Sequence, residues 1–148
     1  MNADDTRLLR IAYAEAKAGF DEGGCPIGSV LARGGKIVSQ GRNQRVQKGD
    51  PIAHGEMDAL RKAGRQKSYR DTTLYTSLSP CMMCSGTIIQ FGIPRVVVGE
   101  SENFGGNEDF LRSRGVEVIV VQDPDCIALM QRFITEKPEL WAEDIAED

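Results

Sequence analysis

The sequence has one histidine, few aromatic residues and no long hydrophobic run. Among its 148 residues the single histidine is His54, and aromatic residues make up 6%. No apolar stretch approaches the roughly eighteen residues that a membrane-spanning helix requires, and residues 1–5 carry two acids without the basic segment of a secretion signal. These absences predict a cytoplasmic protein with no membrane partner. They also leave His54 as the only imidazole available for any chemistry.

An excess of positive charge is also missing. Eighteen Lys and Arg residues stand against 22 Asp and Glu residues, which gives a net charge of −4. Proteins that bind nucleic acids usually carry a basic surface, so the charge predicts no nucleic-acid partner. The length and the absence of repeats or Pro/Ser-rich linkers predict one domain spanning residues 1–148.

Hydrophobic periodicity and turn residues predict helices that alternate with strands. The predicted helices cover residues 6–20, 53–63, 81–91, 108–114 and 125–136, and the predicted strands cover 27–32, 36–40, 73–78, 95–99 and 116–121. Asp5 suits the N-cap of the first helix, and Ser79 followed by Pro80 suits the start of the third. Residues 41–51 are predicted to form a polar loop. The alternation predicts an α/β fold, a three-layer α/β/α sandwich around a central mixed five-stranded sheet.

Three residues have the types and spacing of a zinc site. His54 supplies a nitrogen, and Cys81 and Cys84, separated by two residues, supply two sulfurs. Zinc prefers these ligand types in a tetrahedral arrangement, and three protein ligands leave the fourth position for water. If the cysteines lie in the first turn of a helix, the helix dipole favours their thiolate forms. One zinc ion per subunit is therefore expected.

Glu56 is predicted to carry protons and not to bind the metal. Residues two apart point to different sides of a helix, but His54 and Glu56 can share a helix end that faces the metal. Zinc lowers the pKa of bound water from ~15.7 towards ~7. Glu56 would accept the released proton, pass it to a ring nitrogen and later protonate the departing amine. The predicted reaction is hydrolytic deamination.

The same residues carry a resemblance to a known family. His54-x-Glu56 followed by Pro80-Cys81-x-x-Cys84 is the signature of zinc nucleobase deaminases. The wider sequence resembles the yeast-type cytosine deaminases of the cytidine deaminase superfamily, from about Ile11 to Asp148. The similar segments are 22–24, 26–28, 47–49, 71–84, 91–95, 97–100, 103–104, 133–134, 141 and 143–145. This resemblance implies conversion of free cytosine to uracil and ammonia, in pyrimidine salvage, by a homodimer.

The resemblance also implies which polar groups bind the base. Asn43 would hydrogen-bond the pyrimidine carbonyl and ring N–H, together with the backbone N–H of Gly55. The carbonyl of Ser79 and the carboxylate of Asp144 would accept hydrogen bonds from the exocyclic amine.

Three apolar residues complete the pocket that the resemblance implies. Phe104 and Trp141 would flank the ring and close the pocket, and Ile27 would supply an apolar wall. The C-terminal segment would act as a lid.

Two alternatives concern the metal and the substrate. Cys25 or Cys126 could fill the fourth metal position and make a structural Cys₃His site in a zinc-stabilised interaction module. A redox pair of Cys81 and Cys84 is a further reading of the CxxC spacing. Cys25, residues 57–58 and residues 105–107 depart from the family pattern, and small changes in a pocket wall alter discrimination only modestly. Isocytosine, a 5-substituted cytosine, creatinine or a purine base therefore remain alternative substrates.

Overall fold

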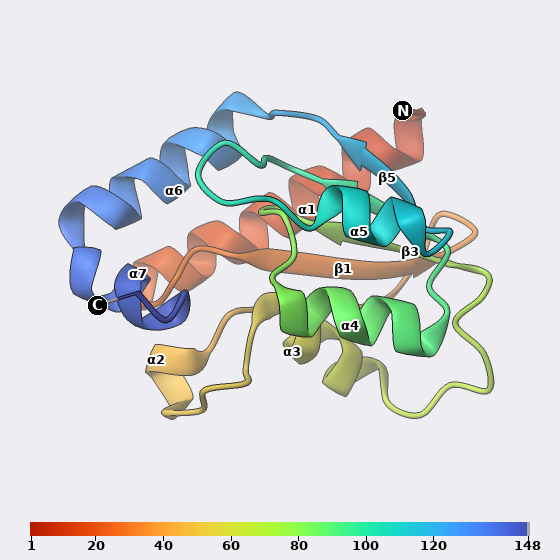
Figure 1. Ribbon diagram of the computed structural model, residues 1–148, viewed down its shortest axis with the longest axis horizontal. Helices are drawn as coiled ribbons and strands as arrows, with labels where there is room; N and C mark the ends of the chain where they lie inside the picture. The colour runs from red at the N-terminus through yellow and green to blue at the C-terminus, as the bar shows by residue number, and fades with distance from the viewer. Residues whose placement is uncertain (148) are drawn as a thin grey trace.

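The computed structural model describes residues 1–147, and its centre is one mixed β-sheet (Figure 1). The strands are β1 (Gly28–Arg33), β2 (Lys36–Arg42), β3 (Thr72–Thr76), β4 (Arg95–Val98) and β5 (Glu117–Val120). Their order in the sheet is β2-β1-β3-β4-β5. Strand β1 is antiparallel to β2 and β3, whereas β3, β4 and β5 are parallel. The predicted mixed five-stranded sheet is thus confirmed.

Helices cover both faces of this sheet. They are α1 (Ala3–Asp21), α2 (Arg45–Lys48), α3 (Gly55–Ala63), α4 (Met82–Phe91), α5 (Glu108–Ser113), α6 (Pro124–Glu136) and α7 (Pro138–Asp144). Side chains alternate between the faces: Leu31 lies in one buried cluster with Leu60 of α3 and Ile88 of α4, and Val30 lies in another with Leu8 of α1. In Figure 1, α1 and α4 lie on opposite sides of β1. The α/β/α sandwich is confirmed.

Helix α1 begins earlier than predicted, and the assignment of Asp5 as its N-cap is wrong. Asn2 is the cap: its side chain accepts a hydrogen bond from the Asp5 backbone N–H, and the Asp5 carboxylate accepts one from the Asn2 N–H. This reciprocal arrangement is a capping box. Asp5 is buried inside the helix and also binds Arg95 and Tyr75. The pattern of apolar residues did not show these long-range partners.

The start of α4 also differs from the prediction. Ser79 was predicted as the N-cap and Pro80 as the first helical residue, but Cys81 is the cap and the helix begins at Met82. The Cys81 sulfur accepts a hydrogen bond from the Cys84 backbone N–H at 3.5 Å. A cysteine sulfur therefore performs the capping role usually filled by a side-chain oxygen.

Two short helices were not predicted. Helix α2 lies inside the predicted loop 41–51, and α7 follows α6 directly, with Lys137 between them. The other elements agree with their predicted ranges within one or two residues, as does the hairpin turn, where Gly34 and Gly35 have positive φ values of 57° and 77°. Among the described residues, none of the helices combines the length and apolar character needed to cross a membrane.

Candidate active site

The starts of two helices bring the three predicted metal ligands together. His54 is the N-cap of α3, Cys81 is the N-cap of α4, and Cys84 lies in the first turn of α4. The His54 Nδ1 atom is 3.4 Å from the Cys81 Sγ and 3.8 Å from the Cys84 Sγ. All three ligand atoms lie within 4.8 Å of one another.

These separations fit a single zinc ion. Zinc–nitrogen and zinc–sulfur bonds of about 2.1 and 2.3 Å in a tetrahedron place the two ligand atoms about 3.6 Å apart. In the part of the chain that the structure describes, no other Cys, His, Asp or Glu completes this group. Cys25 and Cys126 are buried outside it, so the alternative of a structural Cys₃His site has no support from the geometry.

The surroundings of Cys81 favour the metal-binding form of its sulfur. A hydrogen bond from the Cys84 thiol, followed by those from His54 and from the Cys84 backbone N–H, lowers the pKa of Cys81 to about 4 despite its burial. The aligned peptide dipoles at the start of α4 act in the same direction. A thiolate at neutral pH is ready to bind zinc without first losing a proton.

Glu56 lies beside these ligands in a closed environment. It is the second residue of α3, its exposed fraction is 3%, and it lines the same pocket as His54 and Cys81. Burial, and then the negative charge of Cys81, raise the pKa of Glu56 to about 7. A carboxyl group with a pKa near neutrality can both accept and donate a proton at physiological pH.

The pocket next to the metal ligands is small and mostly apolar. Its walls are formed by Ile27, His54, Glu56, Leu78, Ser79, Cys81, Phe104, Trp141, Asp144 and Ile145. The Phe104 and Trp141 ring centroids are 6.0 Å apart with the planes at 89°, a favourable edge-to-face contact. The enclosed space is about 20 Å³, enough for about one water molecule. A heterocyclic substrate therefore enters only if part of this wall moves.

Asn43 joins the pocket through Asp144. The Asn43 Nδ2 donates to the Asp144 Oδ1 at 3.2 Å, and the Asn43 Oδ1 accepts from the Arg45 backbone N–H at 3.0 Å. Burial raises the pKa of Asp144, while the positive charges of His54 and Arg45 oppose that shift. Residues 101 positions apart thus meet at one edge of the pocket.

Gly55, like Asn43 and Cys84, is a predicted site residue that does not itself line the pocket. It is absent from the pocket wall, and a Cβ at this position would lie 2.9 Å from the Ile27 carbonyl oxygen. As the first residue of α3 it has a backbone N–H without a partner inside the helix. Only that N–H is therefore available for the predicted substrate contact.

The structure adds three residues that the sequence did not indicate. Leu78 and Ile145 line the pocket, and Arg45 approaches Asp144. Leu78 had been predicted only as the end of a strand, and the positions of the other two depend on how α2 and α7 fold. At Ser79, whose carbonyl was predicted to bind substrate, the buried hydroxyl has no hydrogen-bond partner within residues 1–147.

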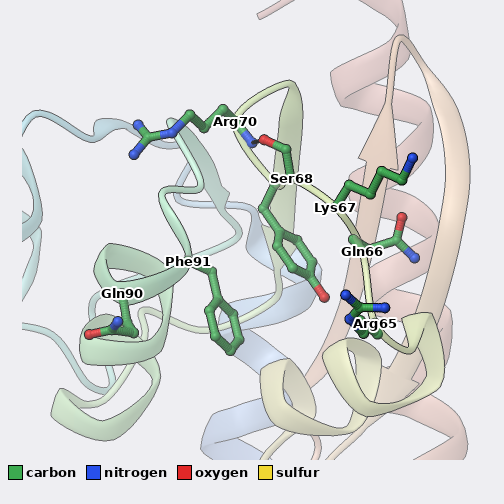
Figure 2. A pocket seen from close by; sticks show the side chains of 8 residues that line it. Arg65, Gln66, Lys67, Ser68, Arg70, Gln90 and Phe91 are labelled. Atoms are coloured by element: carbon green, nitrogen blue, oxygen red, sulfur yellow. Dashed lines mark hydrogen bonds between the residues drawn. The ribbon is translucent and has the colours of Figure 1, made fainter.

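A larger depression of about 390 Å³ lies at the C-terminal ends of α3 and α4, away from the metal ligands at the starts of these helices. It is lined by Arg65, Gln66, Lys67, Ser68, Tyr69, Arg70, Gln90 and Phe91. Figure 2 shows the guanidinium of Arg70 directed away from Lys67 and Arg65, so the cationic groups diverge. None of the lining residues is a metal ligand or a carboxylate. The chemistry therefore belongs to the smaller pocket.

Comparison with known proteins finds deaminases that are similar to this chain over most of its length. Residues 2–100 match the family model for the cytidine and deoxycytidylate deaminase zinc-binding region. The chain is 50% identical over 150 residues to a cytosine deaminase of Candida albicans, covering 99% of this chain and 100% of that one. It is 44% identical over 100 residues to a tRNA-specific adenosine deaminase of Buchnera aphidicola, covering 66% of each chain.

Solved structures share the fold. A structure from a study of tRNA:A34 deaminases has a TM-score of 0.69 and 26% identity, covering 80% of this chain and 100% of the other. Guanine deaminase from Nitrosomonas europaea has a TM-score of 0.73 and 22% identity, covering 86% and 83%, a likeness of fold alone. Since the family model covers two thirds of the sequence and includes the ligand group, the chain belongs to the zinc-binding cytidine and deoxycytidylate deaminase family.

Proposed function

We propose that the chain hydrolyses free cytosine to uracil and ammonia. The observation that carries this proposal is the buried Glu56 in one closed pocket with the His54 and Cys81 ligands. The relative named cytosine deaminase, 50% identical over nearly the whole chain, supports cytosine as the base. The proposal treats residues 1–148 as a single deaminase domain.

The proposed mechanism divides the reaction between the metal and the surrounding residues. Zinc held by His54, Cys81 and Cys84 supplies a Lewis acid that activates water for attack on the amino-bearing carbon. Glu56 takes the proton lost by that water and delivers it to the ring nitrogen. It then takes the remaining proton of the hydroxyl group added to the ring carbon and delivers it to the amine, so that ammonia leaves and the carbonyl of uracil forms. The Glu56 pKa of about 7 suits both transfers.

The base is oriented by the polar groups at the edge of the pocket. The Asn43 amide and the Gly55 N–H bind the ring carbonyl and ring N–H, while the Ser79 carbonyl and the Asp144 carboxylate accept hydrogen bonds from the exocyclic amine. Both carbonyl and carboxylate are acceptors, so they match an amine donor. Cytosine presents an amine to these two acceptors, whereas uracil presents a carbonyl oxygen at the same ring position. Because two acceptors do not hydrogen-bond each other, the change favours release of the product.

The apolar walls favour a free base over a nucleoside. Phe104 and Trp141 meet edge to face, and Ile27 closes the pocket beside them. A ribose attached to the ring would have to displace these side chains. We therefore expect a nucleoside to bind poorly even after the wall has moved to admit a base.

Ammonia release from a panel of compounds tests the substrate. The panel comprises cytosine, 5-methylcytosine, isocytosine, creatinine, adenine, guanine and cytidine. We expect the largest kcat/KM for cytosine, exceeding that for cytidine by at least about 100-fold, a difference of roughly 2.7 kcal/mol in transition-state binding. Faster turnover of cytidine, or of one of the other heterocycles, would reject cytosine as the substrate. The Glu56→Gln variant, purified in parallel, controls for contaminating deaminases.

A homodimer is part of the proposal. Helix α4 exposes Met82 at its first residue and Phe91 at its last, with exposed fractions of 58% and 45%, and Ile52 before α3 is 49% exposed. Large apolar side chains exposed at the two ends of a metal-binding helix and in the loop before α3 fit surfaces that a second copy covers.

A cytoplasmic location is proposed as well. All four cysteines are free thiols in the structure. A reducing compartment keeps thiols in this state and keeps Cys81 and Cys84 available for zinc.

A further inference from the structure

Helix α7 forms part of the pocket wall and is held there by an apolar side and by polar contacts at its C-terminal end. It contains seven residues, and Trp141 is its only buried residue among those described. A helix this short is unstable by itself, so its position depends on contacts with the rest of the protein. Trp141 lies in a buried apolar cluster with Met130 and Phe133, against which Leu140 and Ile145 also pack. Polar contacts at the C-terminal end of α7 add to this packing and fix that end of the helix.

Arg45 provides most of those polar contacts. Its side chain is 12% exposed, its Nη2 atom is 3.4 Å from the Glu143 Oε1, and its Nη1 atom is 3.5 Å from the Asp144 Oδ1. On the other side its Nε donates to the Pro51 carbonyl at 3.4 Å. The guanidinium group is thus fixed to the loop before α3 and faces two consecutive carboxylates of α7.

The backbone of Arg45 acts on the same group of residues. Its N–H donates to the Asn43 Oδ1, which leaves the Asn43 Nδ2 directed at Asp144. Arg45 therefore contacts both polar side chains proposed to bind the edge of the base, one through its backbone and one through its guanidinium.

The burial of Asp144 makes the guanidinium important. Its side chain is 6% exposed, and a buried carboxylate is unfavourable unless it has charged or hydrogen-bonding partners. Without the Arg45 side chain, Asn43 alone would bind it. Hydration then stabilises the carboxylate if it turns outward to water. This movement carries the C-terminal end of α7 with it.

We propose that Arg45 is a positioning residue that holds α7 closed over the pocket through Asp144 and Glu143. The expected effect on catalysis rests on the proposed function, whereas the expected effect on α7 does not. Arg45 touches no reacting atom. It acts by setting the place of Asp144 and of the Trp141 wall.

The experiment uses Trp141 as a reporter, because it is the only tryptophan in the chain. Zinc-loaded wild type, Arg45→Ala, Arg45→Lys and Glu143→Ala are compared by acrylamide quenching of Trp141 fluorescence, with and without saturating pyrimidin-2-one. Lys48→Ala is the matched control, since Lys48 lies on α2 and its side chain is exposed. Zinc content and the melting temperature establish that each variant is folded.

In Arg45→Ala we expect the quenching constant of the free enzyme to rise at least about twofold and the KM for cytosine to rise about tenfold, with kcat changed less than threefold. Pyrimidin-2-one should restore quenching to the wild-type level because the ligand rebuilds the closed wall. Arg45→Lys should recover part of both effects, and Glu143→Ala should show a smaller change in the same direction.

Equal quenching constants in wild type, Arg45→Ala and Glu143→Ala would overturn the proposal, as would a change of equal size in Lys48→Ala. If cytosine is not the substrate, the turnover panel fails for the wild type itself. The effect of Arg45→Ala on Trp141 in the free enzyme remains measurable in that case, so the two failures are distinguishable.

Discussion

His54 and Glu56 show how a helix end accommodates a spacing that a helix face does not. Residues two apart lie on different sides of a regular helix. The backbone of His54 is extended, with φ of −68° and ψ of 161°, and Glu56 follows inside the first turn of α3. Both side chains therefore reach one pocket. The sequence allowed this arrangement to be predicted, because the motif precedes an apolar helical pattern.

The first prediction concerns the proton carried by Glu56. In Glu56→Gln the amide keeps the size of the side chain but has no proton to exchange, so we expect kcat for cytosine to fall by about 10²–10⁴-fold. Zinc content measured by atomic absorption should stay at the wild-type level, because Glu56 lies outside the ligand group. Loss of zinc in this variant would instead identify Glu56 as a ligand.

The second prediction concerns the metal ligands. Cys84→Ala removes one of three ligand atoms and should abolish both zinc retention and deamination, because two ligands do not hold zinc against dialysis. Cys126→Ala is the matched control, since Cys126 is also a buried free thiol but is remote from the group. It should keep zinc and activity. A Cys84→Ala protein with full zinc content would contradict the assignment.

At the scale of the elements, the apolar pattern predicted which segments are helices and strands but not how their polar residues are used. Asp5 had the features of a cap, yet it is buried and receives two hydrogen bonds from Arg95 at 2.8 and 2.7 Å and one from Tyr75 at 2.7 Å. Arg95 and Tyr75 lie on β4 and β3. A partner 90 residues away leaves no local signal in the sequence, so this contact could not be predicted.

This contact gives the third prediction, which concerns acid stability. The hydrogen bonds from Arg95, and next that from Tyr75, hold the pKa of Asp5 well below its usual value although burial acts in the opposite direction. The unfolded chain has a pKa near 3.9 for Asp. The stabilisation is therefore complete above about pH 4–5 and is lost as the pH falls through the folded pKa.

Arg95→Gln should accordingly lower the free energy of unfolding at pH 7 by about 3 kcal/mol, because it leaves a buried carboxylate without its charged partner. Urea unfolding from pH 7 to pH 2.5 should show this difference shrinking below about pH 4. Lys17→Gln removes an exposed i,i+4 pair with Asp21 and should cost less than about 0.5 kcal/mol. A difference for Arg95→Gln that does not change with pH would contradict the explanation.

At the scale of the whole molecule, the sequence predicted the layers and the metal ligands better than the shape of the pocket. Alternating strands and helices define the sandwich, and the ligands stand at helix starts that turn residues mark. The pocket is closed by α7, whose position depends on Arg45 and on Phe104 from a distant loop. These contacts form only after the sheet has brought the segments together. Periodicity within one segment carries no information on them.

The last prediction concerns the association of two chains. Each chain carries a net charge of −4, so two copies repel weakly at long range and need an apolar contact to stay together. The exposed Phe91 and Met82 on α4 provide candidates for that contact. Sedimentation equilibrium at micromolar concentration should give twice the mass of the chain for the wild type.

Phe91→Glu would replace an exposed apolar side chain of the proposed contact by a charge, and we expect it to weaken association at least about 100-fold, a cost of roughly 2.7 kcal/mol. Gln90→Glu adds the same charge at the neighbouring residue, which is also exposed. It should weaken association less than tenfold if association depends on the apolar side chain of Phe91 and not on the added charge. Because α4 carries Cys81 at its start and Phe91 at its end, dissociation in Phe91→Glu should leave zinc content unchanged. A wild-type protein that sediments as a monomer, or a Phe91→Glu variant that stays dimeric, would place the interface elsewhere or remove it.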